Sequence, residues 1–376
     1  MKFRTTLKLL AASIAAVGMT AAAHAADIKL GFAAPLTGPQ SHYGEDMQNG
    51  LNLALEEANK KGIKVDGQPA KFVLVSRDDQ ADPRVGVQVA QQLVDQDVVG
   101  ILGHFNSGTT IPASRVYHEA GLPQIAMATS PEYTKQGYET TFRMMTSDTQ
   151  QGAAVGKFMV QNLKAKKVAI IDDRTAYGQG LADEVEKAVK AAGGEVVRRE
   201  YTTDKANDFT AILTNIKGSA PDAIFYGGLD AQAGPMLRQM EQLGLGNVKF
   251  FGGDALCTEK LPELSGKTPA LKNVTCATGG ASVDKMQGGS DWKKRYDAKF
   301  PGQFQIYSPY AYDAAMVLAD AMKRANSVDP KVFTPSLAKT EHKGVTANIA
   351  FTAKGELTTP AVTLYTFKDG GRVALN

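Results

Sequence analysis

Val98–Thr110 has the sequence VVGILGHFNSGTT, and a similar pattern, PQIAMATSPE, follows at Pro123–Glu132. Each stretch is a short apolar run that ends in a loop of small hydroxyl and amide side chains. An apolar run of about five residues bounded by glycine is typical of a strand buried on both faces of a parallel sheet. The two stretches therefore predict two neighbouring strands of an α/β sheet, each followed by a polar loop.

The loop after the first run leads into a predicted helix that starts near Ser107–Thr110. Free backbone N–H groups and the helix dipole at such a start favour an anion. Ligands of open α/β sheets bind just beyond the carboxyl ends of the strands, so a small carboxylate would fit at this place. Serine and threonine also cap helices without binding any ligand, and capping is the alternative explanation.

Residues 1–25 have the features of a secretory signal. The basic residues of this segment are Lys2, Arg4 and Lys8. An apolar stretch follows over Leu9–Ala23, and Ala23-His24-Ala25 matches the A-x-A cleavage motif. We therefore expect a cleaved signal peptide and a mature protein in the periplasm. No other apolar run approaches the length of a membrane span.

The overall charge gives no support for a nucleic-acid partner. The chain has 42 Lys and Arg against 39 Asp and Glu, and the predicted signal holds three of the basic residues, which leaves 39 of each sign. A near-neutral protein lacks the electrostatic attraction that nucleic-acid binding requires. The remaining chain of about 350 residues exceeds one typical core, so we expect two domains.

The chain has two cysteines, Cys257 and Cys276. In an exported protein they are candidates for a disulfide, which would stabilise the fold by about 3 kcal/mol, and two buried free thiols are the alternative. No C-x-x-C motif occurs, so redox catalysis is not expected.

Strand and helix patterns alternate along most of the chain, and the alternation starts again after Thr146. Besides the two opening runs, the predicted strands are Ile28–Ala34, Lys71–Ser76, Lys167–Asp172, Glu195–Tyr201, Ala223–Tyr226, Val248–Phe251, Thr346–Thr352 and Ala361–Phe367. The predicted helices are Gly44–Lys60, Pro83–Gln96, Thr149–Lys164, Tyr177–Ala192, Phe209–Lys217, Ala231–Leu243, Asp291–Lys299 and Pro309–Asn326. Repeated β–α units predict parallel sheets with right-handed crossovers, arranged as two lobes of the same class.

Motifs for catalysis, metals and cofactors are missing from the sequence. There is no G-x-S-x-G, H-E-x-x-H, P-loop or EF-hand pattern, and Gly178-Gln179-Gly180 lacks the third glycine of a dinucleotide site. The histidines show no metal-ligand spacing. We therefore expect no cofactor, no metal and no enzymatic activity; a periplasmic enzyme acting on amino-acid derivatives is the alternative.

The chain resembles the periplasmic branched-chain amino acid binding proteins of ABC importers, the leucine/isoleucine/valine type. The resemblance extends over essentially the whole mature chain, and it depends on the order of many short motifs. These motifs are Ile28-Lys29, Leu36-Thr37-Gly38-Pro39, Tyr43-Gly44, Arg77-Asp78-Asp79, Gly103-His104, Ser107, Pro112-Ala113-Ser114, Thr129-Ser130-Pro131-Glu132, Tyr177-Gly178-Gln179-Gly180, Tyr226-Gly227-Gly228 and Gly252-Gly253-Asp254.

The resemblance implies a type I periplasmic binding protein fold, in which two Rossmann-like lobes with parallel sheets are joined by three crossovers. It implies a first lobe of residues 27–145 plus 281–342 and a second lobe of residues 146–280 plus 343–376. The lobes of such proteins close on a ligand like a hinged clamp.

By the same resemblance, Ser107 and the amide of Thr129 would bind the α-carboxylate of an amino acid. The Thr129 hydroxyl, the Met127 carbonyl and Asp254 would bind its α-ammonium group. Asp254 replaces the glutamate that is more familiar in the family at this turn, which keeps the charge and shortens the reach. Capping of the following helix is the alternative role for Asp254.

The side-chain pocket would be walled by Tyr43, Phe105 and Tyr177, although Tyr43 and Tyr177 also fit as ordinary partly buried aromatics. Leu229 and Asp230 stand where relatives place a tyrosine after the Tyr-Gly-Gly run, so they would shape the pocket floor. The implied protein is a monomeric receptor that captures a free aliphatic amino acid and delivers it to an inner-membrane ABC permease. A receptor for amides, urea or aromatic acids is the alternative within the same superfamily.

Overall fold

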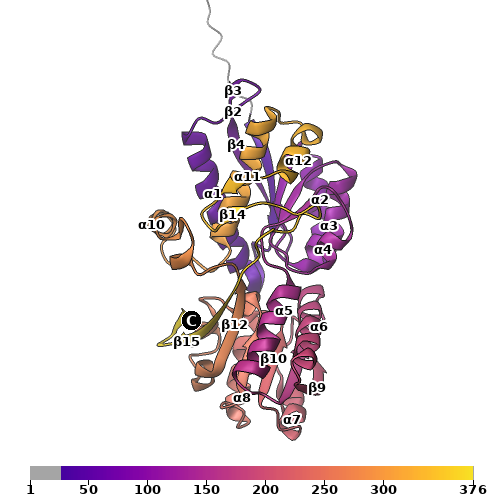
Figure 1. Cartoon of the computed structure of the whole chain (residues 1–376), viewed down its shortest axis with the longest axis vertical. Coiled ribbons are helices and arrows are strands. Elements are labelled where there is room, and N and C mark those ends of the chain that lie inside the picture. The colour runs from indigo at the N-terminus through magenta and orange to yellow at the C-terminus, as the bar shows by residue number, and fades with distance from the viewer. Residues whose placement is uncertain (1–26, 376) are drawn as a thin grey trace, which may run out of the picture.

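The computed structural model describes residues 27–375, and the predicted signal peptide lies outside the described residues. The chain forms two α/β halves stacked along the long axis of the molecule (Figure 1). The first half is built on a five-stranded sheet and the second half on a seven-stranded sheet. Within the described range, none of the helices combines the length and the apolar character needed to cross a bilayer.

The sheet of the first half has the order β4-β1-β5-β6-β7, and all of its strands are parallel. Its strands are β1 Asp27–Ala34, β4 Lys71–Asp78, β5 Gly100–Gly103, β6 Gln124–Ala126 and β7 Thr141–Arg143. The two opening runs of the sequence become β5 and β6, which pair with each other as predicted.

The sheet of the second half has the order β16-β15-β12-β11-β10-β8-β9. Strands β8 to β12 are parallel, whereas β15 and β16 pair antiparallel at one edge. Its strands are β8 Lys167–Asp172, β9 Glu195–Tyr201, β10 Ala223–Gly227, β11 Lys249–Gly252, β12 Val274–Gly279, β15 Val362–Lys368 and β16 Gly371–Ala374. Two short hairpins complete the strands, β2 Lys64–Val65 with β3 Gln68–Pro69, and β13 His342–Lys343 with β14 Asn348–Ile349.

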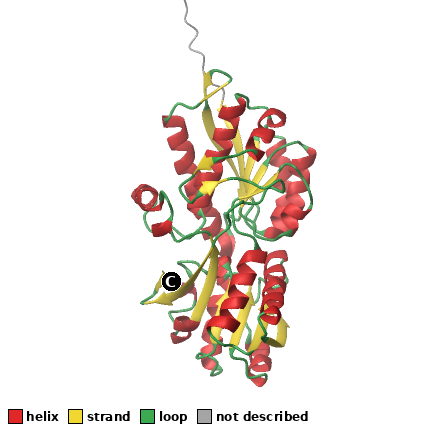
Figure 2. Cartoon of the chain, viewed as in Figure 1, coloured by secondary structure: helices red, strands yellow, loops and turns green. Residues whose placement is uncertain are grey.

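In each sheet the first strand in the chain lies between the next two strands of that sheet, β1 between β4 and β5 and β8 between β9 and β10, which is the order of a doubly wound nucleotide-binding fold. Helices cover both faces of each sheet (Figure 2). The helices of the first half are α1 Ser41–Lys60, α2 Pro83–Val94, α3 Ser107–Glu119, α4 Glu132–Lys135, α10 Gly289–Lys299, α11 Ser308–Ala325 and α12 Pro330–Ala338. Those of the second half are α5 Asp148–Lys157, α6 Ala176–Ala191, α7 Thr210–Gly218, α8 Asp230–Gln242 and α9 Leu261–Leu264.

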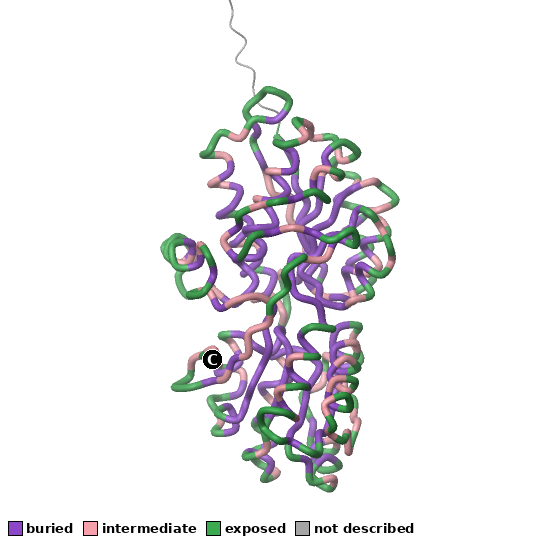
Figure 3. Tube along the Cα trace, viewed as in Figure 1, coloured by how far each residue is buried: buried purple, intermediate pink, exposed green. Residues whose placement is uncertain are grey.

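Alternating side chains of the parallel strands make the core on either face of the sheet. In β1, Leu30 and Phe32 pack with the apolar side of α1, whereas Ala33 packs with α2 and α3 on the other face. Buried residues follow the inner strands of both sheets, and exposed residues lie on the outer sides of the helices (Figure 3). The inner strands are therefore enclosed by packed side chains up to their carboxyl ends, where the polar loops begin.

The chain passes between the halves three times: after β7, after β12 and before β15. The Ala361 carbonyl ties these segments together, because it accepts hydrogen bonds from Gly280 N and Thr146 Oγ1, both at 2.7 Å. Upstream of this point, segment 344–356 bonds to the first half, for example from Arg143 N to Gly355 O at 2.8 Å. The lobe division stays a prediction, and these bonds favour a last boundary near residue 358 over the expected 343.

One predicted strand, Thr346–Thr352, is wrong over most of its length. Within this range, only β14 pairs with another strand, the short β13, and Phe351 forms an isolated bridge with Leu357. The amides of Val345 and Thr346, which come just before β14, donate to the Asp313 carboxylate at 2.8 and 2.7 Å. They are therefore not available to a neighbouring strand. The predicted helix Thr149–Lys164 also ends differently, because α5 passes into a π-helical turn over Phe158–Asn162.

Candidate ligand-binding site

A cavity of about 260 Å³ lies where the carboxyl ends of the two parallel sheets face each other. Its lining residues are Phe105, Asn106, Ser107, Met127, Thr129, Tyr177, Leu229, Asp254, Ala255 and Tyr307. Seven of the nine residues predicted for ligand binding are in this set, and both halves contribute. The arrangement follows the general rule that doubly wound sheets bind ligands beyond the carboxyl ends of their strands.

The sequence left two explanations open for the loop after β5, an anion site and helix capping. Among the residues it describes, the structure shows no capping hydrogen bond by the side chain of the N-cap residue Asn106, and the Thr109 and Thr110 hydroxyls donate to the Asn106 carbonyl at 3.0 and 2.8 Å without satisfying a free N–H group of the first turn. Ser107, the first residue of α3, instead lines the cavity, and its Oγ accepts a bond from Ser130 N at 3.3 Å.

Three buried side chains, joined by hydrogen bonds, fix the start of this loop. His104 has no exposed surface, and its Nδ1 lies 2.6 Å from Asp79 Oδ2 while its Nε2 lies 3.0 Å from the Tyr117 hydroxyl. The His104 carbonyl also accepts from Met127 N at 3.2 Å. This histidine therefore has a structural role that joins the loops after β5 and β6.

The loop after β6 presents Met127 and Thr129 to the cavity. Thr129 is buried, and its carbonyl accepts from Asp148 N, the first amide of α5, at 2.8 Å. That bond crosses from the first half into the first helix of the second half. The two opening stretches of the sequence thus deliver hydroxyls and amides to one place, as predicted.

Asp254 faces these loops from the second half, on a 3-10 turn over Asp254–Leu256 (η3) that is separated from β11 by Gly253. The carboxylate is buried and accepts from the Tyr177 hydroxyl at 2.8 Å. Burial raises the pKa of Asp254 above its ordinary value, and the bond from Tyr177 opposes part of that rise. A buried carboxylate of this kind is stabilised by a cation, such as an ammonium group.

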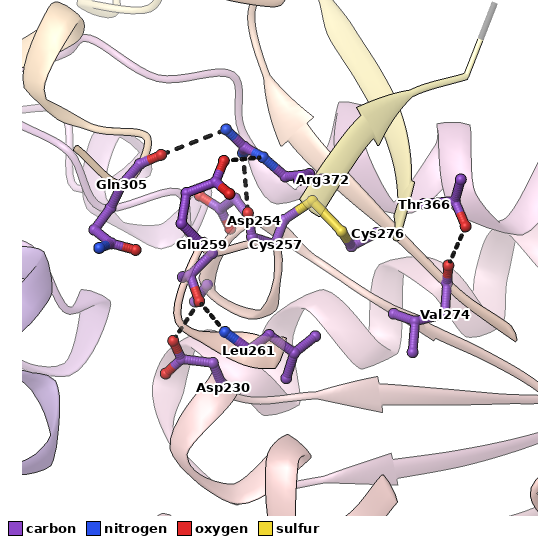
Figure 4. The surroundings of a disulfide bond; sticks show 12 residues. Asp230, Asp254, Cys257, Glu259, Leu261, Val274, Cys276, Gln305, Thr366 and Arg372 are labelled. Atoms are coloured by element: carbon purple, nitrogen blue, oxygen red, sulfur yellow. Dashed lines mark hydrogen bonds and ion pairs between the residues drawn. A yellow bond between two sulfur atoms is a disulfide. The ribbon is translucent and has the colours of Figure 1, made fainter. Parts of the chain in front are cut away.

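A disulfide between Cys257 and Cys276 joins the end of the Asp254 turn to β12, with a Cα–Cα distance of 5.4 Å. The Cys257 carbonyl accepts from Arg372 Nη1 at 2.9 Å, and Arg372 also pairs with Glu259 at 3.2 Å (Figure 4). The turn that carries Asp254 is therefore fixed covalently to the sheet and by an arginine of β16.

Aromatic rings form the apolar part of the cavity. Phe105 stacks on Tyr43 with ring centroids 4.7 Å apart and meets Tyr307 edge to face at 4.9 Å. Tyr307 was missed at the sequence level, although it lies two residues before the predicted helix Pro309–Asn326. Its position is set by Asp46, whose buried carboxylate accepts from Tyr307 N at 2.7 Å.

Tyr43 and Asp230, which we expected in the pocket, do not line the cavity. The Tyr43 hydroxyl instead contacts Asp230 Oδ1 at 2.6 Å and the Ala255 carbonyl at 2.5 Å. Asp230 also accepts from Thr258 Oγ1 at 2.5 Å and lies 2.9 Å from His42 Nε2. These residues bond to each other across the junction, because α1 and α8 begin on opposite sides of it.

Asp148 is a second buried carboxylate near the site, and the sequence analysis did not identify it. Within residues 27–375, neither of its oxygens has a hydrogen-bond partner. Burial and the charge of Asp254 raise the pKa of Asp148 to about 8. Over the same residues, His, Cys, Asp and Glu form no group of three or more that could hold a metal ion.

A comparison with known protein families identifies the family of the chain. The periplasmic binding protein family matches residues 27–372, which is nearly all of the described chain. The chain belongs to the periplasmic binding proteins. This binding protein is 35% identical over 347 residues to "Leu/Ile/Val-binding protein homolog 1" of Brucella suis, which covers 92% of this chain and 91% of the relative. It is 32% identical to the leucine-, isoleucine-, valine-, threonine- and alanine-binding protein of Pseudomonas aeruginosa, over 97% of both chains.

Solved structures show the same fold. The leucine-binding protein of Thermotoga maritima superposes on this binding protein with a TM-score of 0.85 at 26% identity, covering 93% of this chain and 98% of that one. The branched-chain amino acid binding protein of Streptococcus pneumoniae, in complex with isoleucine, gives a TM-score of 0.83 at 26% identity, covering 93% and 99%. The predicted family and the two-sheet α/β class are therefore confirmed.

Proposed function

We propose that this protein is a periplasmic receptor that binds a free branched-chain amino acid between its two halves. We propose further that it delivers the amino acid to the permease of an ABC importer and catalyses no reaction on it. One observation carries the proposal: a small cavity has hydroxyl and amide groups on one side, a buried carboxylate on the other, and aromatic and aliphatic walls.

The two ends of the cavity suit the two charges of an amino acid. Ser107 and the Thr129 amide would bind the α-carboxylate, whereas Asp254, the Thr129 hydroxyl and the Met127 carbonyl would bind the α-ammonium. Hydrogen bonds to charged groups contribute about 1.5–3 kcal/mol each, so several of them select the zwitterion strongly.

The apolar walls select the side chain less strongly. Phe105, Tyr177, Tyr307 and Leu229 surround the rest of the cavity and would contact an aliphatic side chain. One methylene in such a pocket changes the binding free energy by only about 1–3 kcal/mol. Leucine, isoleucine and valine are therefore expected to bind within about 100-fold of one another.

Calorimetric titration with each standard amino acid tests the proposal. We expect leucine, isoleucine and valine to bind more tightly than acidic, basic or amide-bearing amino acids. Mass spectrometry of the ligand released from denatured protein gives an independent result, since a tightly bound solute is retained through purification. No binding of any of the three branched-chain amino acids would contradict the proposal.

Two alternatives give different results in the same experiments. An aromatic acid or urea has no ammonium group, so its binding would survive replacement of Asp254 by alanine. An enzyme acting on amino-acid derivatives would return a changed ligand after long incubation, whereas a receptor returns the ligand unchanged.

A further inference from the structure

Arg143, the last residue of β7, has a side chain with no exposed surface and lies directly behind the Thr129 loop. Its Nη1 donates to the Ala128 carbonyl, and its Nη2 donates to the Ser130 carbonyl at 2.9 Å. One guanidinium therefore holds the carbonyl groups on both sides of Thr129. Arginine suits this task because its planar fork presents several donors in a fixed geometry.

The Ala128 carbonyl determines how the Thr129 amide points. The two groups belong to one planar trans peptide, in which the C=O and N–H bonds point in opposite directions. The Thr129 N–H therefore points away from the atom that the Ala128 carbonyl faces. Since that atom belongs to Arg143 and Thr129 lines the cavity, the amide is directed to the cavity side of the loop.

Glu356 fixes the guanidinium from the opposite direction. Arg143 Nε lies 2.9 Å from Glu356 Oε2 and Nη2 lies 3.0 Å from Oε1, which makes a two-point ion pair. Thr134 Oγ1 also donates to Glu356 at 2.5 Å. Burial would raise the pKa of Glu356, but the hydrogen bond and the charge of Arg143 lower it below its ordinary value.

Glu356 belongs to the segment that leads into the third passage between the halves. Five residues later, Ala361 receives the hydrogen bonds from Thr146 and Gly280 that join the three passages. Arg143 N also donates to Gly355 O at 2.8 Å. The Thr129 loop is thereby connected through Arg143 to the segment that joins the halves.

We propose that Arg143 and Glu356 act as a positioning pair, which aims the Thr129 backbone at the carboxylate of the ligand without touching the ligand. This inference rests on the proposed function, because it assigns a cause to the recognition of the amino-acid carboxylate. A purely structural ion pair would affect every ligand equally, whereas a positioning pair affects the carboxylate selectively.

The test compares L-leucine with L-leucinol, in which a neutral CH2OH group replaces the carboxylate. The variants are Glu356→Gln, which keeps the shape and removes the charge, and Arg143→Lys, which keeps the charge and removes the fork. The matched control is Glu132→Gln, because Glu132 is an exposed carboxylate close to Thr129 in the chain and pairs with the exposed Lys135 at 2.8 Å. Circular dichroism verifies the fold of each variant, and calorimetry with displacement titrations gives the affinities.

We expect both variants to bind leucine about tenfold more weakly, with a change of less than about twofold for leucinol and for the control. Leucine affinity within about twofold of the unmodified protein, or equal losses for both ligands, would overturn the positioning role. The unmodified protein in the same titration tests the proposed function separately. If it binds no leucine, both proposals fail; if it binds leucine and the ratio of the two affinities is unchanged in the variants, only the positioning role fails.

Discussion

The Asp254 carboxylate is buried at the edge of the cavity, where Tyr177 donates to it at 2.8 Å. We expect Asp254→Asn to weaken leucine binding about 10–100-fold, because it removes the charge that pairs with the ligand ammonium. Calorimetry measures the change. Glu263→Gln is the control, since Glu263 lies in the next helix and its side chain is 76% exposed. Unchanged leucine affinity in Asp254→Asn would show that the ammonium binds elsewhere.

Asp148 makes the stability of the protein depend on pH. Its pKa is about 8 in the folded chain and 3.8 in its ordinary state, so between these values the folded chain keeps a proton that the unfolded chain has lost. The folded state then binds more protons, and the contribution of Asp148 to the free energy of unfolding falls as the pH rises from about 4 to about 8.

Asp148→Asn removes this contribution. We expect the stability of the ligand-free variant, relative to that of the unmodified protein, to rise by on the order of 5 kcal/mol between about pH 4 and about pH 8. Urea unfolding at both pH values measures the difference. Asp291→Asn is the control, because the Asp291 side chain is 86% exposed. A constant difference between the variant and the unmodified protein across this range would contradict the assignment.

At the scale of elements, the turn after β11 is held by the Cys257–Cys276 disulfide, which closes a short loop of 19 residues in sequence separation. We expect replacement of both cysteines by serine to lower the free energy of unfolding by about 3 kcal/mol, because the unfolded chain loses a constraint. Urea denaturation measures the loss. Since Cys257 lies three residues from Asp254, we also expect weaker leucine binding, whereas reduced stability with unchanged affinity would show that the turn holds its shape without the disulfide.

At the scale of the whole molecule, the two halves bond directly to each other beside the cavity. The Tyr43 hydroxyl, from the first half, contacts Asp230 and the Ala255 carbonyl of the second half. None of these bonds involves the ligand, yet they form only when the halves meet. They therefore favour the arrangement in which both ends of the cavity reach the same amino acid.

We expect Tyr43→Phe to weaken leucine binding about tenfold, because the variant loses a hydrogen bond to a buried carboxylate in the closed arrangement. Calorimetry gives the affinity, and small-angle scattering in the absence of ligand is expected to show a larger mean radius of gyration. Tyr201→Phe is the control, since Tyr201 is 55% exposed on β9. Equal affinity and equal scattering for Tyr43→Phe and the unmodified protein would remove this role from Tyr43.

The sequence alone determined the β–α alternation, the parallel α/β class, and the loops that carry Ser107 and Thr129. Each of these depends on neighbouring residues: an apolar run makes a buried strand, and the residues that follow it must lie at the carboxyl edge of the sheet. Asp254 was predicted from the resemblance of the Gly252-Gly253-Asp254 turn to the family, and its position two residues after the end of β11 places it at the same edge of the second sheet.

Only the tertiary structure decided what residues far apart in the chain do together. Tyr307 lines the cavity because Asp46 accepts a hydrogen bond from its backbone amide, and Tyr43 lies outside the cavity lining because its hydroxyl contacts Asp230 and the Ala255 carbonyl. Arg143 and Glu356 are separated by 213 residues and meet because the chain returns to the first half before its last passage. Such contacts depend on how the tertiary structure brings distant segments of the chain together, and no local pattern of apolar and polar residues encodes that geometry.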